Sequence, residues 1–254
     1  MAQFDYVSDL HIDYWDPKWK TSFMSCGLIK NRPLDWKKMK VKSDVLVVAG
    51  DVSDNLEFTI KYLKSLRKYY KKILFVDGNH EHVYRYPRLY SNNYIYKKFK
   101  GIKNIHYIPE EDFVIGKTVF IGFCGWWNYS QGKEKSKSKK FSEKDKESII
   151  RKAKLQAEKL NKKIKKYQRN KNIDDIVIVT HTIPNSKFAR YINTDSNSFF
   201  EELELGNKVK RWVFGHVHTR GIYDFGNIKF LINCRGRPDD NIKEPYSIKT
   251  SKIN

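Results

Sequence analysis

Five short apolar segments of the 254-residue chain each end in a polar string, and this pattern constrains the fold more than any other feature. The strings are Ser8-Asp9-Leu10-His11, Gly50-Asp51, Gly78-Asn79-His80-Glu81, Thr180-His181 and Gly215-His216-Val217-His218. Each apolar segment predicts a β-strand, so we expect the strings to gather along one edge of a sheet, beyond the carboxyl ends of its strands. Their oxygen and imidazole groups are ligands that divalent Mn, Fe, Zn or Co accept, so this edge is a predicted metal site.

The rest of the chain alternates strand and helix patterns, which is typical of an α/β fold. Between the second and third apolar segments, Leu56, Ile60, Leu63 and Tyr70 recur on one face of a predicted helix. This strand, helix and strand have the length of a βαβ crossover, which predicts parallel pairing of the two strands. We expect strands at residues 4–7, 45–49, 73–76, 118–123, 176–179, 211–214 and 229–232.

Length and composition favour one intracellular domain. With 40% hydrophobic residues the chain can bury a substantial core, and residues 1–254 contain no linker that would divide it. We expect a cytoplasmic protein without a membrane partner, because there is no leader pattern and no apolar run near the roughly 20 residues of a membrane helix. Cys26, Cys124 and Cys234 are scattered, which predicts reduced thiols with no metal role.

Positive charge is concentrated in one segment. Between Lys133 and Lys171, 17 basic and five acidic residues supply +12 of the formal net charge of +21. We interpret residues 132–171 as an insertion, with a Lys- and Ser-rich loop at 132–140 and a helix that Ser142 caps. Its lysines either form a solvated face, or attract nucleic acid or a small phosphorylated substrate. The apolar stripe of this helix is predicted to contain Ile150, Ala153, Ala157, Leu160, Ile164 and Tyr167.

Paired metal ions would suit hydrolysis of a phosphate ester. Such an ester repels hydroxide, and water is a poor nucleophile near neutral pH. Two cations roughly 3.5–4 Å apart lower the pKa of a bridging water and neutralise charge on the phosphoryl oxygens. Asp51 is the expected bridge, because Gly50 before it has no side chain and allows close approach. Asp9 and His11 are two residues apart, so an extended backbone directs both to one side.

The ordered set Asp-x-His, Gly-Asp, Gly-Asn-His-Glu, His and Gly-His-x-His resembles the calcineurin-like metallophosphoesterase superfamily. The resemblance implies an α/β/β/α sandwich of two mixed β-sheets flanked by helices, with the active site at the carboxyl ends of the strands. It also implies two divalent metal ions, Mn²⁺ foremost, with Fe, Zn, Co, Ni or Mg as alternatives. By this resemblance one ion would bind Asp9, His11 and His218, the other Asn79, His181 and His216, and Asp51 would bind both.

The same resemblance gives His80 a catalytic role that does not involve binding metal. His80 would face the leaving oxygen or a phosphoryl oxygen as general acid or electrostatic stabiliser, with Asp51 as the other catalytic residue. Glu81 could orient the groups beside it. His82 and His106 occupy no position of the family pattern, so we expect them to be ordinary core or surface residues.

A narrower likeness concerns the string Asn233-Cys234-Arg235-Gly236-Arg237-Pro238. It is similar to a string in a group of small, mostly uncharacterised metallophosphoesterases that commonly reads Asn-Pro-Arg-Gly-Tyr-Pro. Cys234 and Arg237 depart from that pattern, as does Thr182, where a second histidine is common. Arg235 could bind phosphate bidentately or close the loop over the next glycine. Asn233 and Glu81 are further candidate substrate contacts.

The residues after Asp51 bear on the substrate. Serine/threonine protein phosphatases of the superfamily carry Gly-Asp-x-x-Asp-Arg-Gly, whereas here Val52-Ser53-Asp54-Asn55 follows. We therefore expect a phosphodiesterase or phosphatase acting on a nucleotide or another small phosphorylated molecule. The alternative is a metal-dependent nuclease on RNA or DNA, which would bind through residues 133–171. A catalytically inactive phosphoesterase-like scaffold is a third hypothesis, which the complete histidine set disfavours.

Overall fold

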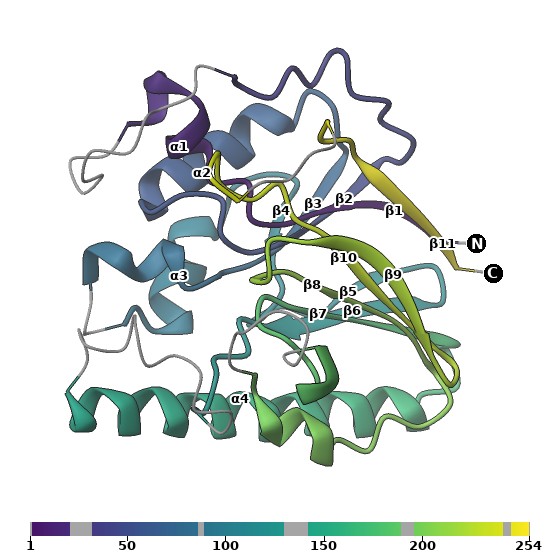
Figure 1. Ribbon diagram of the computed structural model, residues 1–254. Helices are drawn as coiled ribbons and strands as arrows, with labels where there is room; N and C mark the ends of the chain where they lie inside the picture. Colours follow the sequence, from purple (N-terminus) through teal and green to yellow (C-terminus); the bar gives the residue numbers. More distant parts are fainter. Residues whose placement is uncertain are drawn as a thin grey trace.

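The structure, a computed structural model, describes residues 2–20, 32–85, 89–129, 142–188, 196–240 and 245–253. Its two β-sheets stack face to face and carry helices on their outer faces (Figure 1). This arrangement confirms the expected α/β/β/α sandwich. The predicted Lys-rich loop at 132–140 lies outside the described residues.

The first sheet has the strand order β11-β1-β2-β3-β4. Strands β1 to β4 run parallel, as the βαβ pattern predicts, and β11 pairs antiparallel with β1. Every residue of β2 is buried, because the strand lies in the middle of the sheet and is covered on both faces. The strands span Ala2–Val7 (β1), Val45–Ala49 (β2), Lys72–Val76 (β3), Ile105–Tyr107 (β4) and Lys249–Ile253 (β11).

The second sheet has the order β5-β6-β7-β8-β10-β9. Its four inner strands are parallel, and the edge strands β5 and β9 are antiparallel to their neighbours. All seven predicted strands are present in the two sheets, with ends within two residues of the prediction. The strands of the second sheet span Phe113–Ile115 (β5), Thr118–Phe123 (β6), Asp175–Thr180 (β7), Val209–Phe214 (β8), Arg220–Phe225 (β9) and Ile228–Asn233 (β10).

The central core lies between the two sheets. Phe4 of β1 and Phe120 of β6 meet edge to face there, with ring centroids 5.3 Å apart. Short aliphatic side chains, among them Val47, Val177 and Val213, fill the remaining space. Because both inner faces are apolar, the sheets are fixed against each other, and the loops at their carboxyl ends share one rim.

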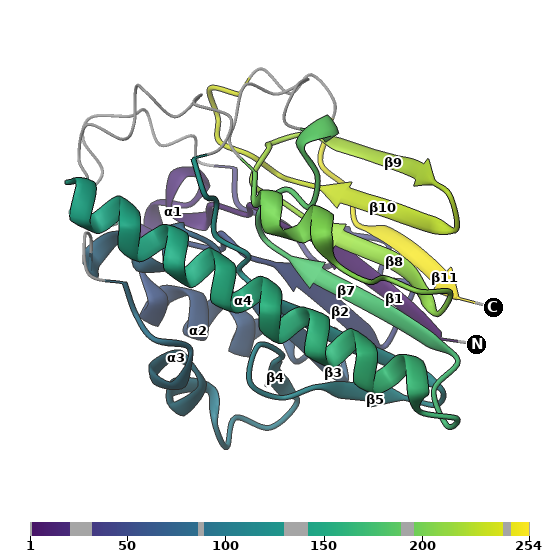
Figure 2. The ribbon, with the colours of Figure 1, turned by 90° about the horizontal axis from the view of Figure 1, so that it is seen from below.

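Helices cover the outer faces of the sandwich. Helices α2 (Leu56–Leu66) and α3 (Asn92–Phe99) pack on the first sheet, and α4 (Glu143–Arg169) runs along the second (Figure 2). The Asn55 side chain caps α2 by accepting from the N–H groups of Glu57 and Phe58. The short elements are α1 (Ile12–Trp15) and the 3₁₀ turns η1 (Pro17–Trp19), η2 (His80–Arg85) and η4 (Ser198–Glu202).

Helix α4 begins with the predicted cap, because Ser142 and Asp145 form a reciprocal capping box. One position of its predicted stripe is wrong: Ile149 is buried and Ile150 is only half-buried. The stripe that contains Ala153 reaches position 149 when it is extended back by one turn of four residues. Among the described helices, none has the length and apolar content that a bilayer crossing demands.

The polar strings do not all belong to one sheet, so the expectation of a single sheet edge is wrong. Three of them follow β1, β2 and β3 of the first sheet, whereas two follow β7 and β8 of the second. The sheets meet at this rim, where Ser8 forms an isolated parallel bridge with Cys234. Two sheets therefore contribute loops to one site.

Candidate metal centre

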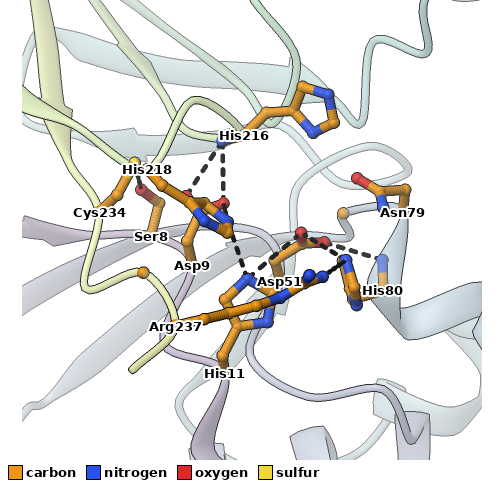
Figure 3. A network of polar contacts seen from close by, with 12 residues as sticks. Ser8, Asp9, His11, Asp51, Asn79, His80, His216, His218, Cys234 and Arg237 are labelled. Atoms are coloured by element: carbon orange, nitrogen blue, oxygen red, sulfur yellow. Dashed lines mark hydrogen bonds and ion pairs between the residues drawn. The ribbon is translucent and has the colours of Figure 1, made fainter. Parts of the chain in front are cut away.

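Hydrogen bonds connect the loops of the two sheets around a shared centre (Figure 3). Within the first sheet, Asp9 N–H donates to the Gly50 carbonyl at 3.0 Å. Between the sheets, His216 N–H lies 3.0 and 3.1 Å from the two carboxylate oxygens of Asp9. His181 Nδ1 lies 2.9 Å from the Ala49 carbonyl, which directs its Nε2 toward the centre. Protein contacts thus fix the loops relative to one another.

Asp9, His11 and His218 form the first cluster of possible metal ligands. The Nε2 atoms of His11 and His218 are 3.0 Å apart, and His218 Nε2 is 3.4 Å from Asp9 Oδ1. Asp9 and His11 are completely buried. One nitrogen from each imidazole and one carboxylate oxygen therefore converge on a small volume.

Asp51, His181 and His216 form the second cluster. His181 Nε2 lies 3.2 Å from Asp51 Oδ2 and 3.1 Å from the side-chain oxygen of Asn79. The same Asp51 oxygen is 3.9 Å from His11 Nε2 in the first cluster. Asp51 Oδ2 consequently lies between the two clusters.

The backbone at these loops is strained. Seven non-glycine residues of the described chain have positive φ angles, and five of them are Asp9, His11, Asp51, His216 and His218. Each such residue brings its Cβ close to a carbonyl oxygen, at a cost of roughly 1–2 kcal/mol. The coincidence of strain with the candidate ligands indicates that the loops are shaped for the site.

Glycines make room for the converging side chains. A Cβ on Gly50 would lie 2.6 Å from His181 Nδ1, and one on Gly215 would lie 2.5 Å from Asp9 Oδ2. A Cβ on Gly78 would overlap Asp51 Oδ1. These three glycines are therefore required by close packing against candidate ligands, in addition to the positive φ of Gly50.

Burial and mutual charge give the histidines different protonation. Burial alone would lower the pKa of His181, but the carboxylates of Asp51 and Asp9 outweigh it and raise the pKa to about 10. Burial and the charge of His181 lower the pKa of His216 to about 3. The donor set fits divalent ions, because the buried carboxylates that raise the pKa of His181 would equally attract a cation, and His216 offers a neutral imidazole.

His80 lies at the edge of the centre between two charged partners. Its Nδ1 bonds to the Asp54 carboxylate. Its Nε2 lies 2.7 Å from a guanidinium nitrogen of Arg237 (Figure 3). His80 Nε2 is also 3.8 Å from Asp51 Oδ2. His11, Asp54 and His80 form a third group with the spacing of a metal site, but it shares His11 with the first cluster. A proton on Nδ1 satisfies both hydrogen bonds, because Nδ1 then donates to Asp54 and Nε2 accepts from Arg237.

Comparison with known families identifies the chain. The family model of calcineurin-like phosphoesterases matches residues 3–220. The chain belongs to this family. An uncharacterized protein of Acanthamoeba polyphaga mimivirus is 26% identical to this calcineurin-like phosphoesterase over 270 aligned positions, which cover 95% of the chain and 94% of the viral protein.

Two solved structures share the fold of this calcineurin-like phosphoesterase. A phosphopantetheinyl hydrolase from Mycobacterium tuberculosis has a TM-score of 0.70 at 16% identity, and the match covers 99% of this chain and 96% of the other. A dimetal phosphatase from Danio rerio has a TM-score of 0.54 at 10% identity, over 98% and 91% of the two chains. At these identities the likeness concerns the fold alone.

Glu81 has no exposed surface and contacts the backbone of the metal loops. Its carboxylate accepts N–H bonds from Gly78 and Val52 at 2.7 Å and from Asp51 at 3.0 Å. The Thr59 hydroxyl donates to it as well. Burial and the Asp51 charge raise the pKa of Glu81 to about 8, although these donors favour its ionised form. This placement fits an orienting role and leaves no surface for a substrate contact.

Asn233 and Arg235 are also buried in the family fold. The Asn233 amide donates to the carbonyls of Tyr6 and Ser247, which ties β10 to the first sheet. Arg235 is 6% exposed and lies over the Trp15 ring, 4.4 Å from its centroid. These contacts fit a structural role for Asn233, whereas Arg235 borders a cavity next to the centre.

Asp54 and Arg237 are the partners of His80 that sequence analysis did not assign. Asp54 lies three residues after Asp51, in the loop that follows β2. This second carboxylate near the predicted centre could have indicated a partner for His80. Arg237 gave no such signal, because it is distant in sequence and departs from the related pattern.

His82 and His106 lie outside the described metal clusters. His82 is buried and hydrogen-bonded to Asp77, and His106 pairs with Glu111.

Proposed function

We propose that this phosphoesterase hydrolyses a phosphate ester of a nucleotide or another small phosphorylated molecule, with two divalent ions at the paired clusters. The observation that supports this most is the position of Asp51 Oδ2, which is 3.9 Å from His11 Nε2 and 3.2 Å from His181 Nε2. One buried carboxylate oxygen is thereby shared by two groups of ligands.

The residues divide between two ions as follows. Asp51 would bind both ions, of which Mn²⁺ is the foremost candidate. When bound, the ions supply an activated water and offset the negative charge of the phosphoryl group. One ion would be held by Asp9, His11 and His218, and the other by Asn79, His181 and His216.

His80 would act on the leaving oxygen or on a phosphoryl oxygen. Asp54 fixes the ring by bonding to Nδ1, so that Nε2 faces the centre. In the arrangement observed, Arg237 donates to Nε2, which leaves that atom without a proton. A bound phosphoryl group would attract the Arg237 guanidinium away from His80. Once Arg237 has moved away, Nε2 would take a proton from solvent and donate it to the leaving oxygen.

Helix α4 gives limited support to the nuclease alternative. Several of its lysines already have partners, since Lys163 pairs with Asp112 at 2.7 Å and Lys165 pairs with Glu204 at 2.6 Å. Lys208, which precedes β8, donates to the Asn170 carbonyl just after the helix. The C-terminal part of α4 thus lies near the amino end of β8, whereas the candidate ligands follow the carboxyl ends. The total charge of +21 remains the argument for a polymeric substrate.

The test of the proposed function is hydrolysis of p-nitrophenyl phosphate and bis-p-nitrophenyl phosphate with added Mn²⁺. Asp51→Asn should lower kcat/KM by at least about 100-fold, because the shared carboxylate charge is lost. Asp44→Asn is the control, since Asp44 is exposed and pairs only with Lys71 among its described ion-pair partners. Inactivity of the unmodified protein toward both esters with Mn²⁺, Fe²⁺, Zn²⁺ and Co²⁺ would favour the scaffold hypothesis.

A salt series separates the small ester from the polymer. Turnover of an oligonucleotide that depends on contacts with α4 should fall steeply between low and physiological salt. Turnover of a mononucleotide should change little, because a small substrate releases few counterions. A flat response with the oligonucleotide would remove the argument for a nuclease.

A further inference from the structure

A cavity of about 590 Å³ lies beside the metal centre. It has the volume of a site for a small organic ligand. Arg237 belongs both to the cavity wall and to the centre, because its guanidinium contacts His80 Nε2 at 2.7 Å. The described residues that define its chemistry are Trp15, Arg32, Arg220, Arg235, Arg237 and Tyr246.

The guanidinium groups of two lining arginines, Arg235 and Arg237, have no carboxylate partner in the described part of the chain. Among the residues that the structure describes, no carboxylate lies within 4 Å of the guanidinium of Arg235 or Arg237. Asp35 is the acidic residue among the described lining residues, and it pairs with Lys38 at 3.7 Å. Arg235 is 6% exposed, and a buried cation without an anionic partner is costly. An anionic ligand would offset that cost.

The aromatic walls support the arginines. The Arg235 guanidinium lies 4.4 Å from the centroid of the Trp15 ring, and that of Arg220 lies 5.0 Å from the centroid of Tyr246. The Trp15 indole is itself fixed by donating to the Gly236 carbonyl at 2.8 Å. Stacked guanidinium groups cover these ring faces, so the cavity is suited to an anion more than to a nucleobase.

Backbone hydrogen bonds fix the cavity relative to the centre. Arg235 N–H donates to the Ser8 carbonyl, and Gly236 N–H donates to the Asp9 carbonyl, both at 3.0 Å. The arginine loop is thereby attached to the loop that carries two candidate metal ligands. A ligand spanning both places would meet a fixed distance between them.

We propose that this cavity binds a second phosphate group of the substrate, so that the substrate is a small molecule with two phosphates. One phosphate would be cleaved at the metal centre, while Arg220 and Arg235 hold the other. This inference rests on the proposed function, because it assigns the cavity to the substrate of the same reaction.

The experiment compares matched esters that differ only in the second phosphate. We would measure kcat/KM for monophosphates and bisphosphates of unbranched α,ω-diols with two to six carbons. For at least one length the bisphosphate should be preferred by about tenfold or more, which is the gain expected from charge-assisted hydrogen bonds. Arg220→Gln and Arg235→Gln should reduce this ratio toward one. Lys229→Gln, which removes an exposed charge that pairs with Asp224, should preserve it.

A binding measurement keeps the two proposals separate. Calorimetric titration of the preferred bisphosphate into protein in EDTA should show binding that Arg220→Gln weakens by about tenfold. If the esters are not hydrolysed but this binding is found, the proposed function fails and the anion cavity stands. The second-phosphate site is refuted if the esters are hydrolysed with a bisphosphate-to-monophosphate ratio of kcat/KM near one at every length and the titration shows no binding. Because Arg235 is buried, thermal unfolding must show that Arg235→Gln is folded; Arg220 is more exposed and provides the independent variant.

Discussion

The metal centre and helix α4 are built in opposite ways. The centre consists of short loops from two sheets, with buried polar side chains and five strained candidate ligands. Helix α4 is 27 residues of regular structure with one apolar stripe and a lysine-rich exposed side. Unfavourable backbone angles are concentrated where candidate ligands converge. The lysines of α4, by contrast, lie on a helix whose position is already explained by the packing of its apolar stripe. In this molecule, strain therefore identifies the candidate site better than charge does.

The largest effect is expected from damage to the packing stripe of α4. Leu160 is completely buried, so Leu160→Ala should lower the free energy of unfolding by about 2–5 kcal/mol. Leu155 on the same helix is 48% exposed, and Leu155→Ala should change the free energy of unfolding by less than about 0.5 kcal/mol. Urea denaturation followed by circular dichroism measures both. Equal effects would contradict the packing account of α4.

Steric damage to the centre should mainly affect activity. In Gly50→Ala the new Cβ would lie 2.6 Å from His181 Nδ1 and displace that ring, so kcat/KM for p-nitrophenyl phosphate should fall about 100-fold. Gly101 has a similar positive φ but no atom within 4 Å of the added Cβ. Gly101→Ala should therefore cost roughly 1–2 kcal/mol of stability and leave kcat/KM unchanged. Full activity of folded Gly50→Ala would show that the close packing is not needed.

Removing the carboxylate behind His80 should have a smaller effect. Asp54→Asn keeps the shape of the side chain but loses the charge beside Nδ1, so kcat should fall about tenfold. Metal content, measured by mass spectrometry, should stay unchanged. Asp224→Asn, at an exposed ion pair with Lys229, is the control. Loss of bound metal in Asp54→Asn would instead favour the third group as a metal site.

The smallest effect is expected from the exposed lysines of α4. Lys159→Gln combined with Lys162→Gln should change kcat/KM for a small ester by less than about twofold, because salt screens exposed charges beyond a Debye length of about 8 Å. The comparison is made at low and physiological salt with p-nitrophenyl phosphate and with an oligonucleotide. A large loss of kcat/KM that occurs only with the oligonucleotide at low salt would instead support a role of α4 in binding nucleic acid.

The sequence predicted that the candidate ligands would lie near the carboxyl ends of strands, whereas their division between two ions was implied by the resemblance to the family and stays a prediction. Asp9, His11 and His218 are far apart in the chain, but each follows a predicted strand, and the carboxyl ends of parallel strands meet at one rim. The short strands β4 and β5, with three residues each, gave no comparable pattern.

Contacts between loops account for what sequence analysis could not predict. The contact between Arg237 and His80 spans 157 positions and depends on how the two sheets stack. The burial of Arg235 depends on the Trp15 ring, which no periodicity connects to it. Local patterns carry strand order and cap chemistry, but they do not determine which loops meet across a sandwich.

The central claim is that two ions share Asp51, and anomalous diffraction from crystals grown with excess Mn²⁺ tests it most directly. We predict two peaks roughly 3.5–4 Å apart. One should lie among Asp9, His11 and His218, the other among Asn79, His181 and His216, with an Asp51 oxygen between them. A single peak, or peaks outside these clusters, would contradict the account.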